Sequence, residues 1–190
     1  MIRTVYVSGA IFAAAIMMAA CTHSAVEEEV VVAEPVAVAP ELPTLYYAMT
    51  DIYQPEFQGV ADTAFWAYDD DGNLDSSLLT DEQWATMKAS AEVLRDTSRA
   101  FAAAEQIRVA EDGEELFNEG QGFIASEDVQ AIIDAEPDGF KAMMTYLADE
   151  AERTLDAIEA RDAEALSLSS DNLYAACKTC HTVYWYPGRR

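Results

Sequence analysis

The stretch Cys177-Lys178-Thr179-Cys180-His181, near the C-terminal end, constrains what this chain can be more than any other feature. Two cysteines three residues apart, followed directly by a histidine, form the attachment signal for a c-type haem. Each thiol adds across one haem vinyl group, and positions i, i+3 and i+4 of a helix share one face. The motif therefore predicts one covalent haem c, bound through Cys177 and Cys180, with His181 as an axial iron ligand.

Other chemistries use cysteines or acidic residues in similar patterns. A thioredoxin-like redox pair lies near a strand–helix–strand pattern, and none surrounds this motif. A closed zinc site needs four ligands, but the remaining candidates, Cys21 and His23, lie at the opposite end of the chain. The aspartates at 69–71 lack the glycine and glutamate that a calcium loop requires further along. A haem-free helical module or redox dithiol is the alternative that remains.

Residues 1–20 read as an export signal of the lipoprotein type. Arg3 supplies the positive charge, an apolar run follows, and Met18-Ala19-Ala20 precedes Cys21 as in a bacterial lipobox. This pattern predicts that Cys21 becomes the lipidated first residue of the mature chain; the alternative is an uncleaved N-terminal membrane helix. Either way, we expect the rest of the chain on the periplasmic side of a bacterial membrane. With one cysteine assigned to lipid and two to haem, no disulfide is predicted.

Residues 21–43 form the lipidated cysteine and a linker, with three glutamates, several valines and three prolines. Proline spacing and like charges favour an extended chain. The full chain of 190 residues carries a net charge of −24. Such a charge excludes nucleic acid and anionic lipid surfaces as partners and favours a partner with a basic docking face. A solvated acidic surface with no dedicated docking patch explains the same charge.

Residues 44–190 form the predicted haem domain, in which apolar residues recur at helical spacing. A first helix is expected over 44–70, kinked at or starting from Pro55. A second begins at Thr80, which forms a capping box with Gln83, and runs to about Val109. A third begins at Pro137, and a fourth, capped by Asp162 or Asp171, carries the haem motif and stops at 187–188. The fold class is all-α, an antiparallel four-helix bundle with haem attached on the C-terminal helix.

The chain resembles the class II c-type cytochromes, the cytochrome c-prime family and its low-spin relatives. The stretch Tyr174–Tyr184, with the haem motif close to the chain end, is the most specific likeness. Trp84 followed by an alanine-rich helix with Leu94, and Met49 six residues before Pro55, support it. The resemblance covers residues 44–187. It implies a haem lying between the helices, with its distal face toward the first helix.

Three features depart from that family pattern. The connection over 110–136 is longer than the compact link between the family's second and third helices. Trp185 and Tyr186 follow Tyr184 where the family often has an arginine after the aromatic, and Arg189 and Arg190 come slightly later. The lipid tether also differs from the usual soluble form. These departures bear on the partner and on homodimer formation, both of which the sequence leaves open.

The sixth iron ligand decides what such a haem does. Methionine gives a six-coordinate, low-spin iron of raised potential, suited to electron transfer, whereas leucine or phenylalanine leaves an open position for small gases. Met49 is the family-implied candidate; core packing is the alternative, and Leu45 would face the iron if the register slipped one turn. Further methionines are predicted to be packing residues, and a set of aromatic residues is predicted to wall the haem crevice or fill the core: Met87, Met143 and Met144; Trp66, Trp84, Phe101, Phe140, Tyr174 and Tyr184.

We therefore expect a membrane-tethered, single-electron carrier with His181 and Met49 as iron ligands, or else a five-coordinate protein that binds gases such as nitric oxide. Enzymatic processing of peroxide is not expected, because no distal histidine or arginine is placed to split an O–O bond. His23, the second histidine, lies in the linker.

Overall fold

The computed structural model describes residues 42–114 and 122–188. The signal peptide, Cys21, nearly all of the linker, Arg189 and Arg190 lie outside these ranges, so the predictions for them stay predictions. Within the described ranges no helix combines the length and apolar composition needed to span a bilayer. The same residues form no β-strand, and Tyr68 and Leu74 make one isolated antiparallel bridge.

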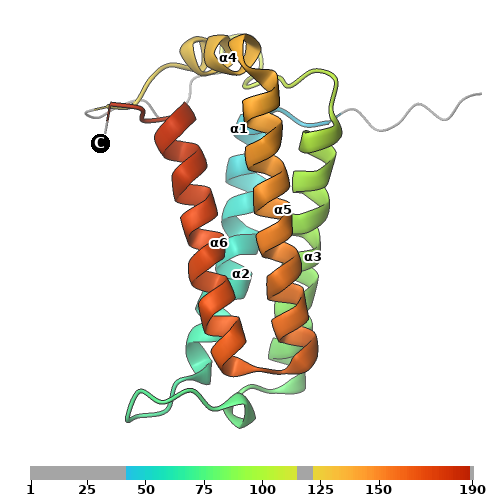
Figure 1. The fold of residues 1–190 in the computed structure, drawn as a ribbon, viewed down its shortest axis with the longest axis vertical. Coiled ribbons are helices and arrows are strands. Elements are labelled where there is room, and N and C mark those ends of the chain that lie inside the picture. Colours follow the sequence, from blue (N-terminus) through green and yellow to red (C-terminus); the bar gives the residue numbers. More distant parts are fainter. Residues whose placement is uncertain (1–41, 115–121, 189–190) are drawn as a thin grey trace, which may run out of the picture. The chain divides into compact units, whose positions relative to one another are not determined.

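The predicted four-helix bundle is confirmed (Figure 1). Its first helical segment, which we call the first rod, consists of α1 (Leu45–Tyr47), the π-helical η1 (Ala48–Tyr53) and α2 (Gln54–Ala64). The short 3₁₀ turn η2 (Phe65–Ala67) follows it. A second 3₁₀ turn, η3 (Ser76–Leu78), leads into α3 (Asp81–Ala103). The two long helices α5 (Pro137–Ala160) and α6 (Ala163–Tyr184) complete the bundle.

Local signals fix where the long helices begin. The Thr80 hydroxyl accepts a hydrogen bond from the Gln83 amide at 3.2 Å, and the Gln83 side chain accepts one from the Thr80 amide at 2.9 Å. This is the capping box that the sequence predicted. Asp162 caps α6 by accepting from Glu164 N and Ala165 N, both at 3.0 Å. Pro137 occupies the first turn of α5, where its missing N–H costs nothing.

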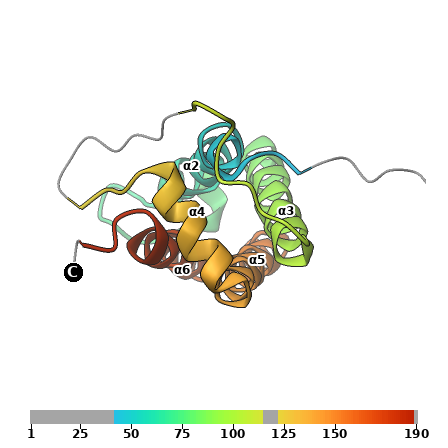
Figure 2. The same ribbon diagram turned by 90° about the horizontal axis from the view of Figure 1, so that it is seen from above.

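The sequence was wrong about the end of α3 and about the connection that follows. The helix stops at Ala103, not near Val109, and residues 104–110 are not helical. They run beside the start of the first rod, where Leu45 N donates to Arg108 O at 2.8 Å and Tyr46 N to Val109 O at 2.9 Å. A helix that the sequence did not predict, α4 (Ser126–Ala135), then crosses the end of the bundle (Figure 2).

The core lies between the first rod and the helices α3, α5 and α6. Its largest fully buried side chains come from α3, α4, α5 and α6 as well as from the first rod: Phe101, Phe140, Met87, Leu94, Ile133, Met144, Leu166, Leu173 and Val60. Burial of each such side chain stabilises the fold by about 1.5–3 kcal/mol before the cost of chain ordering. Met87 and Met144 are buried, and Met143 is half-buried against the core, which confirms them as packing residues.

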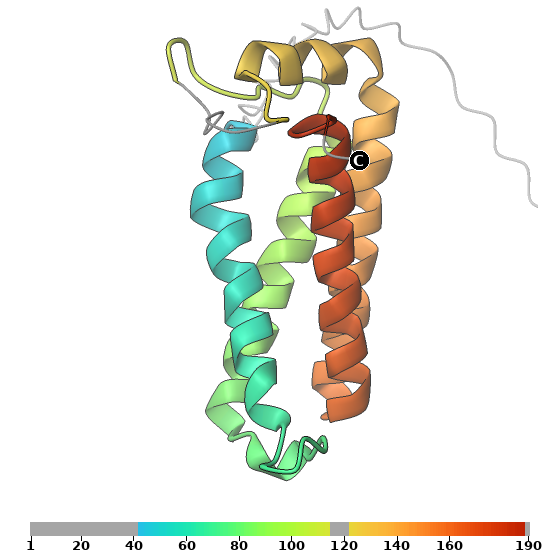
Figure 3. The ribbon, with the colours of Figure 1, turned by 90° about the vertical axis from the view of Figure 1, so that its left-hand side faces the viewer.

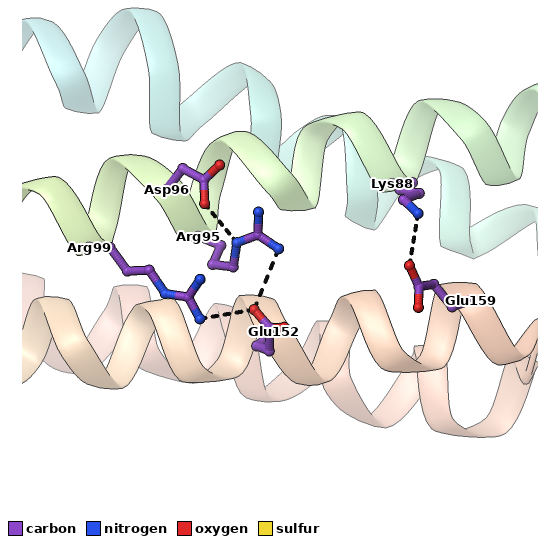
Figure 4. Close-up of polar contacts among 6 residues, drawn as sticks. All are labelled: Lys88, Arg95, Asp96, Arg99, Glu152 and Glu159. Carbon is purple, nitrogen blue, oxygen red and sulfur yellow. Dashed lines mark hydrogen bonds and ion pairs between the residues drawn. The ribbon is translucent and has the colours of Figure 1, made fainter. Parts of the chain in front are cut away.

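Ion pairs line the outer seam between α3 and α5 (Figure 4). Lys88 Nζ lies 2.8 Å from Glu159 Oε1, while Arg95 and Arg99 both reach Glu152, at 3.5 and 3.1 Å. All of these groups are partly or largely exposed, so each pair contributes at most about 1 kcal/mol. These ion pairs therefore contribute little to the stability of the bundle.

Candidate haem-attachment site

Helix α6 brings Cys177, Cys180 and His181 onto one side of its last two turns. The helix is continuous from Ala163 to Tyr184, so the three residues keep the i, i+3, i+4 spacing that places them together. The helix ends shortly after His181, in a turn where Trp185 N and Tyr186 N both donate to His181 O at 2.9 Å. The attachment motif is therefore held on a rigid element.

Both cysteines of the motif are free thiols in a mostly apolar setting. Cys180 is buried and Cys177 is half-buried. Burial raises the pKa of Cys177 to about 11 and the pKa of Cys180 to about 12, since a thiolate is poorly solvated there. Both groups therefore carry their protons near neutral pH, and neither is engaged in a disulfide.

The imidazole of His181 is half-buried, and burial lowers its pKa, so the neutral form is favoured. Its ring lies edge-on to Trp185, with centroids 5.2 Å apart, and to Tyr186, with centroids 6.0 Å apart. Among residues 42–114 and 122–188, none donates to or accepts from the ring nitrogens. A neutral imidazole with unengaged nitrogens is suited to bind iron.

The segment before α4 supports the residues that surround His181. Phe123 packs edge-on against Trp185 and Tyr186, with centroids 5.0 and 5.6 Å apart, and Ile124 N donates to Trp185 O at 3.1 Å. Phe123, Trp185, Tyr186 and the His181 ring thus form one aromatic cluster. The sequence noted Trp185 and Tyr186 as departures from a family pattern but gave no reason to expect Phe123 beside them.

The first rod lies opposite the haem-bearing part of α6 (Figure 3). Tyr53, in the last position of η1, is buried, and its hydroxyl lies 3.1 Å from Ser98 Oγ and 3.8 Å from Met144 Sδ. Burial raises the pKa of Tyr53, while the hydrogen bond with Ser98 lowers it and charge on Cys180 or Cys177 raises it further. The sequence offered no reason to assign Tyr53 a role.

Met49, the predicted sixth ligand, lies one turn before Tyr53 in the same π-helical segment. It is half-buried and packs against the core, while its alternative, Leu45, is buried at the start of the rod. A π-helical turn re-aims the side chains on either side of it and is common at functional sites. Met49 as an iron ligand stays a prediction.

Two of the six predicted crevice aromatics are not buried. Trp66 is 66 % exposed because η2 turns away from the bundle after α2, and Tyr174 is 55 % exposed beside Phe57, with ring centroids 6.2 Å apart. The other four are buried: Trp84, Phe101, Phe140 and Tyr184. Trp66 and Tyr174 therefore do not fill the core, and their lining of a haem crevice stays a prediction.

The donor set fits a c-type haem. Two protonated, unpaired thiols are available for thioether formation, and a neutral imidazole follows on the same side of the helix. The neighbouring aromatic rings of Trp185 and Tyr186 supply apolar walls. Elsewhere in the described part of the chain, no group of three or more His, Cys, Asp or Glu residues is arranged to hold a bare metal ion.

Comparison with known proteins agrees with this donor set. The sequence model of the family described as Cytochrome C′ matches residues 79–185, which is more than half of the chain. The match spans α3 to α6 and includes the whole Cys–Cys–His motif, but it leaves out the first rod with Met49 and Tyr53. No curated protein and no solved structure matches the chain. The chain therefore belongs to the cytochrome c′ family, whose members carry a c-type haem.

Proposed function

We propose that this protein is a single-electron carrier that holds one haem covalently through Cys177 and Cys180, with His181 as an axial iron ligand. The observation that carries the proposal is the arrangement of two free thiols and a neutral, unengaged imidazole on one face of α6. When bound, the haem supplies an iron that cycles between the ferric and ferrous states. The chain's own part is to fix the porphyrin, to present His181, and to exclude water through the surrounding aromatic rings.

Met49 is the proposed sixth ligand, because it lies on the first rod and packs toward the core. A thioether at this position would close the iron to other ligands and raise its potential. The experiment is an absorption spectrum of the reduced holoprotein, with Met49→Ala beside it. A low-spin spectrum that becomes high-spin in Met49→Ala supports the assignment, whereas a high-spin spectrum in both proteins overturns it.

A gas-binding protein with an open sixth position is the second candidate function. The match to the Cytochrome C′ family supports this function as well as the first, and that match covers residues 79–185, without Met49. Carbon monoxide binding to the reduced protein separates the two functions. Rapid binding favours the open site, while no binding on that timescale favours electron transfer.

The chain is further proposed to be a periplasmic lipoprotein, anchored to a bacterial membrane through Cys21. The lipobox-like Met18-Ala19-Ala20-Cys21 and the extended linker after it support this location. Labelling with a fatty acid should mark the wild-type chain and not Cys21→Ser, and the substituted protein should lose its membrane association. Membrane association that persists unlabelled would favour an uncleaved N-terminal helix instead.

Covalent attachment has its own direct test. Expressed in cells able to mature c-type cytochromes, the protein should gain the mass of one haem, and Cys177→Ala and Cys180→Ala together should abolish this gain. His181→Ala should keep the thioethers but change the absorption of the bound haem. A wild-type chain of unaltered mass would overturn the proposal and leave a haem-free helical module.

A further inference from the structure

An open apolar groove lies beside the haem-bearing end of α6, between that helix and α4. It has a volume of about 700 Å³ and is lined by apolar side chains with two carboxylates among them: Ile124, Ala131, Ile132, Ala135, Val183, Tyr184 and Pro187, with Asp128 and Glu136. Val183 is 40 % exposed in its wall. The groove exists because α4, the helix that the sequence did not predict, crosses this end of the bundle.

The charged residues of the segment that forms the α4 side of this groove have one sign. From Gly122 to Gly139 the chain has five acidic residues and no lysine or arginine: Glu127, Asp128, Asp134, Glu136 and Asp138. Lys141 and Lys178 of the neighbouring helices are not among its lining residues, and Arg189 and Arg190, which follow Pro187 in the sequence, lie outside the described residues. Apolar side chains in the centre with charged groups around them match the core and rim of a protein–protein interface.

We propose that this groove, which we call the α4–α6 groove, is the docking surface for a basic redox partner that inserts an apolar side chain between the two helices. The inference rests on the proposed electron-carrier function. The net charge of −24 attracts any basic protein over long range, but it does not select a place on the surface. The apolar groove determines the place of docking, because an apolar side chain of the partner is removed from water only where it enters the groove.

The position of the groove along α6 suits electron transfer. Tyr184, which lines the groove, lies three residues after His181 and four after Cys180, so it shares their side of α6. A second exposed apolar surface, formed by Phe65, Trp66 and Leu168, lies near the other end of α6. Leu168 precedes Cys177 by nine residues, about 13 Å along the axis, so a partner bound there would be far from the haem.

The first test uses a basic class I cytochrome c in its ferric form as the probe. Its rate of reduction by the reduced holoprotein is measured by stopped flow at low ionic strength. Asp128→Asn with Glu136→Gln changes the net charge by two in the groove, and Asp70→Asn with Asp71→Asn makes the same change in the loop before α3. We expect the groove pair to slow the reaction ~3- to 10-fold and the loop pair less than about 2-fold, because charges at the contact steer docking most.

The second test fills the groove without changing its charge. Ala131, exposed on α4, is replaced by tryptophan, and Ala89, exposed on α3, receives the same replacement as the matched control. Ala131→Trp should slow the reduction of the probe by a factor similar to that of the groove pair, whereas Ala89→Trp should not. Helix content from circular dichroism verifies that each variant is folded.

A third readout does not depend on electron transfer. Carbodiimide joins a carboxylate of this chain to a lysine of the bound probe, and peptide mass spectrometry locates the bond. Cross-links at Asp128 or Glu136 support the docking site even if the haem proves not to pass electrons. Equal slowing by both charge pairs, or cross-links gathered at Asp70 and Asp71, would overturn it while leaving the proposed function intact.

Discussion

The imidazole of His181 and the indole of Trp185 lie edge to face, with their centroids 5.2 Å apart and their planes at 82°. An iron-bound histidine usually has its ring orientation fixed by a hydrogen bond from its second nitrogen. Here the described residues surround the ring with aromatic edges instead, and Phe123 buttresses them from the segment before α4. The orientation of the proposed iron ligand is thus set by packing.

Replacing Trp185 by leucine should loosen that orientation. The smaller side chain leaves one side of the imidazole without contact, so the ferric holoprotein should show broadened or doubled signals in electron paramagnetic resonance. Loss of the half-buried indole should also lower the free energy of unfolding by about 1–3 kcal/mol. Trp66→Leu, which removes a largely exposed indole, is the control and should change neither; identical spectra for Trp185→Leu and wild type would contradict the packing argument.

Tyr53→Phe should cost about 1 kcal/mol of unfolding free energy, because it removes the hydrogen bond to Ser98 and the contact to Met144 Sδ while keeping the ring. The loss stays small because Ser98 Oγ still donates to Leu94 O at 2.7 Å. Chemical denaturation measures the change. Tyr47→Phe, at an exposed position, should leave stability unaltered, and an equal loss in both variants would argue against a specific buried bond.

The carboxylate of Glu150 is buried on α5, with one oxygen 2.6 Å from Arg153 and the other, Oε2, without a partner among the described residues. Removing only its partner should be costly: Arg153→Ala should lower the unfolding free energy by about 1–3 kcal/mol, since the buried charge loses its compensation. Replacing the acid itself by methionine should be neutral or stabilising. The thermal unfolding temperature should therefore fall for Arg153→Ala and stay level or rise for Glu150→Met. A similar fall in both variants would show that the Glu150 carboxylate stabilises the fold.

The haem-free protein should lose stability in alkali. The folded-state pKa values of Cys177 and Cys180, about 11 and 12, lie above the ordinary value of 9.0, so the unfolded chain releases these protons first. Their contribution is complete below pH 9 and is lost as the pH rises toward 12. Burial of Tyr53 acts in the same direction above its ordinary pKa of 10.0.

Substitution of both cysteines by alanine distinguishes the contribution of the thiols to the pH dependence of stability from that of Tyr53. Denaturation across pH 8–11 should give a shallower loss of stability in the double variant than in the haem-free wild type. The mature holoprotein should resemble the double variant, because thioether sulfurs do not titrate. A steep loss in the holoprotein would mean that the thiols are still free.

Helix starts were predictable because they depend on neighbours in the sequence. Thr80 with Gln83, Pro137 and Asp162 each satisfy or remove amide donors within the first turn, whatever the rest of the fold does. The end of α3 was not predictable in this way. Ile107 and Val109 continue a helical spacing of apolar residues, yet both are buried in an extended segment.

That extended segment is stabilised by partners far away in the sequence. The Gln130 side chain of α4 accepts from Val109 N at 2.8 Å and donates to Ile107 O at 2.9 Å, which replaces the hydrogen bonds that a longer α3 would have made. Helix α4 itself has no side-chain cap at Ala125, and only Val129, Ile132 and Ile133 mark its apolar face. Neither feature stands out locally, so the sequence could not show that they stabilise each other.

The sequence by itself determined the haem-attachment motif, because the spacing of Cys177, Cys180 and His181 on a helix is a local property. It also determined the bundle, since period and capping act within a few residues. Only the tertiary structure decided what surrounds the motif. Phe123 and the residues of α4 lie beside the end of α6 although they are far from it in the sequence, and contacts of that range depend on how whole helices pack.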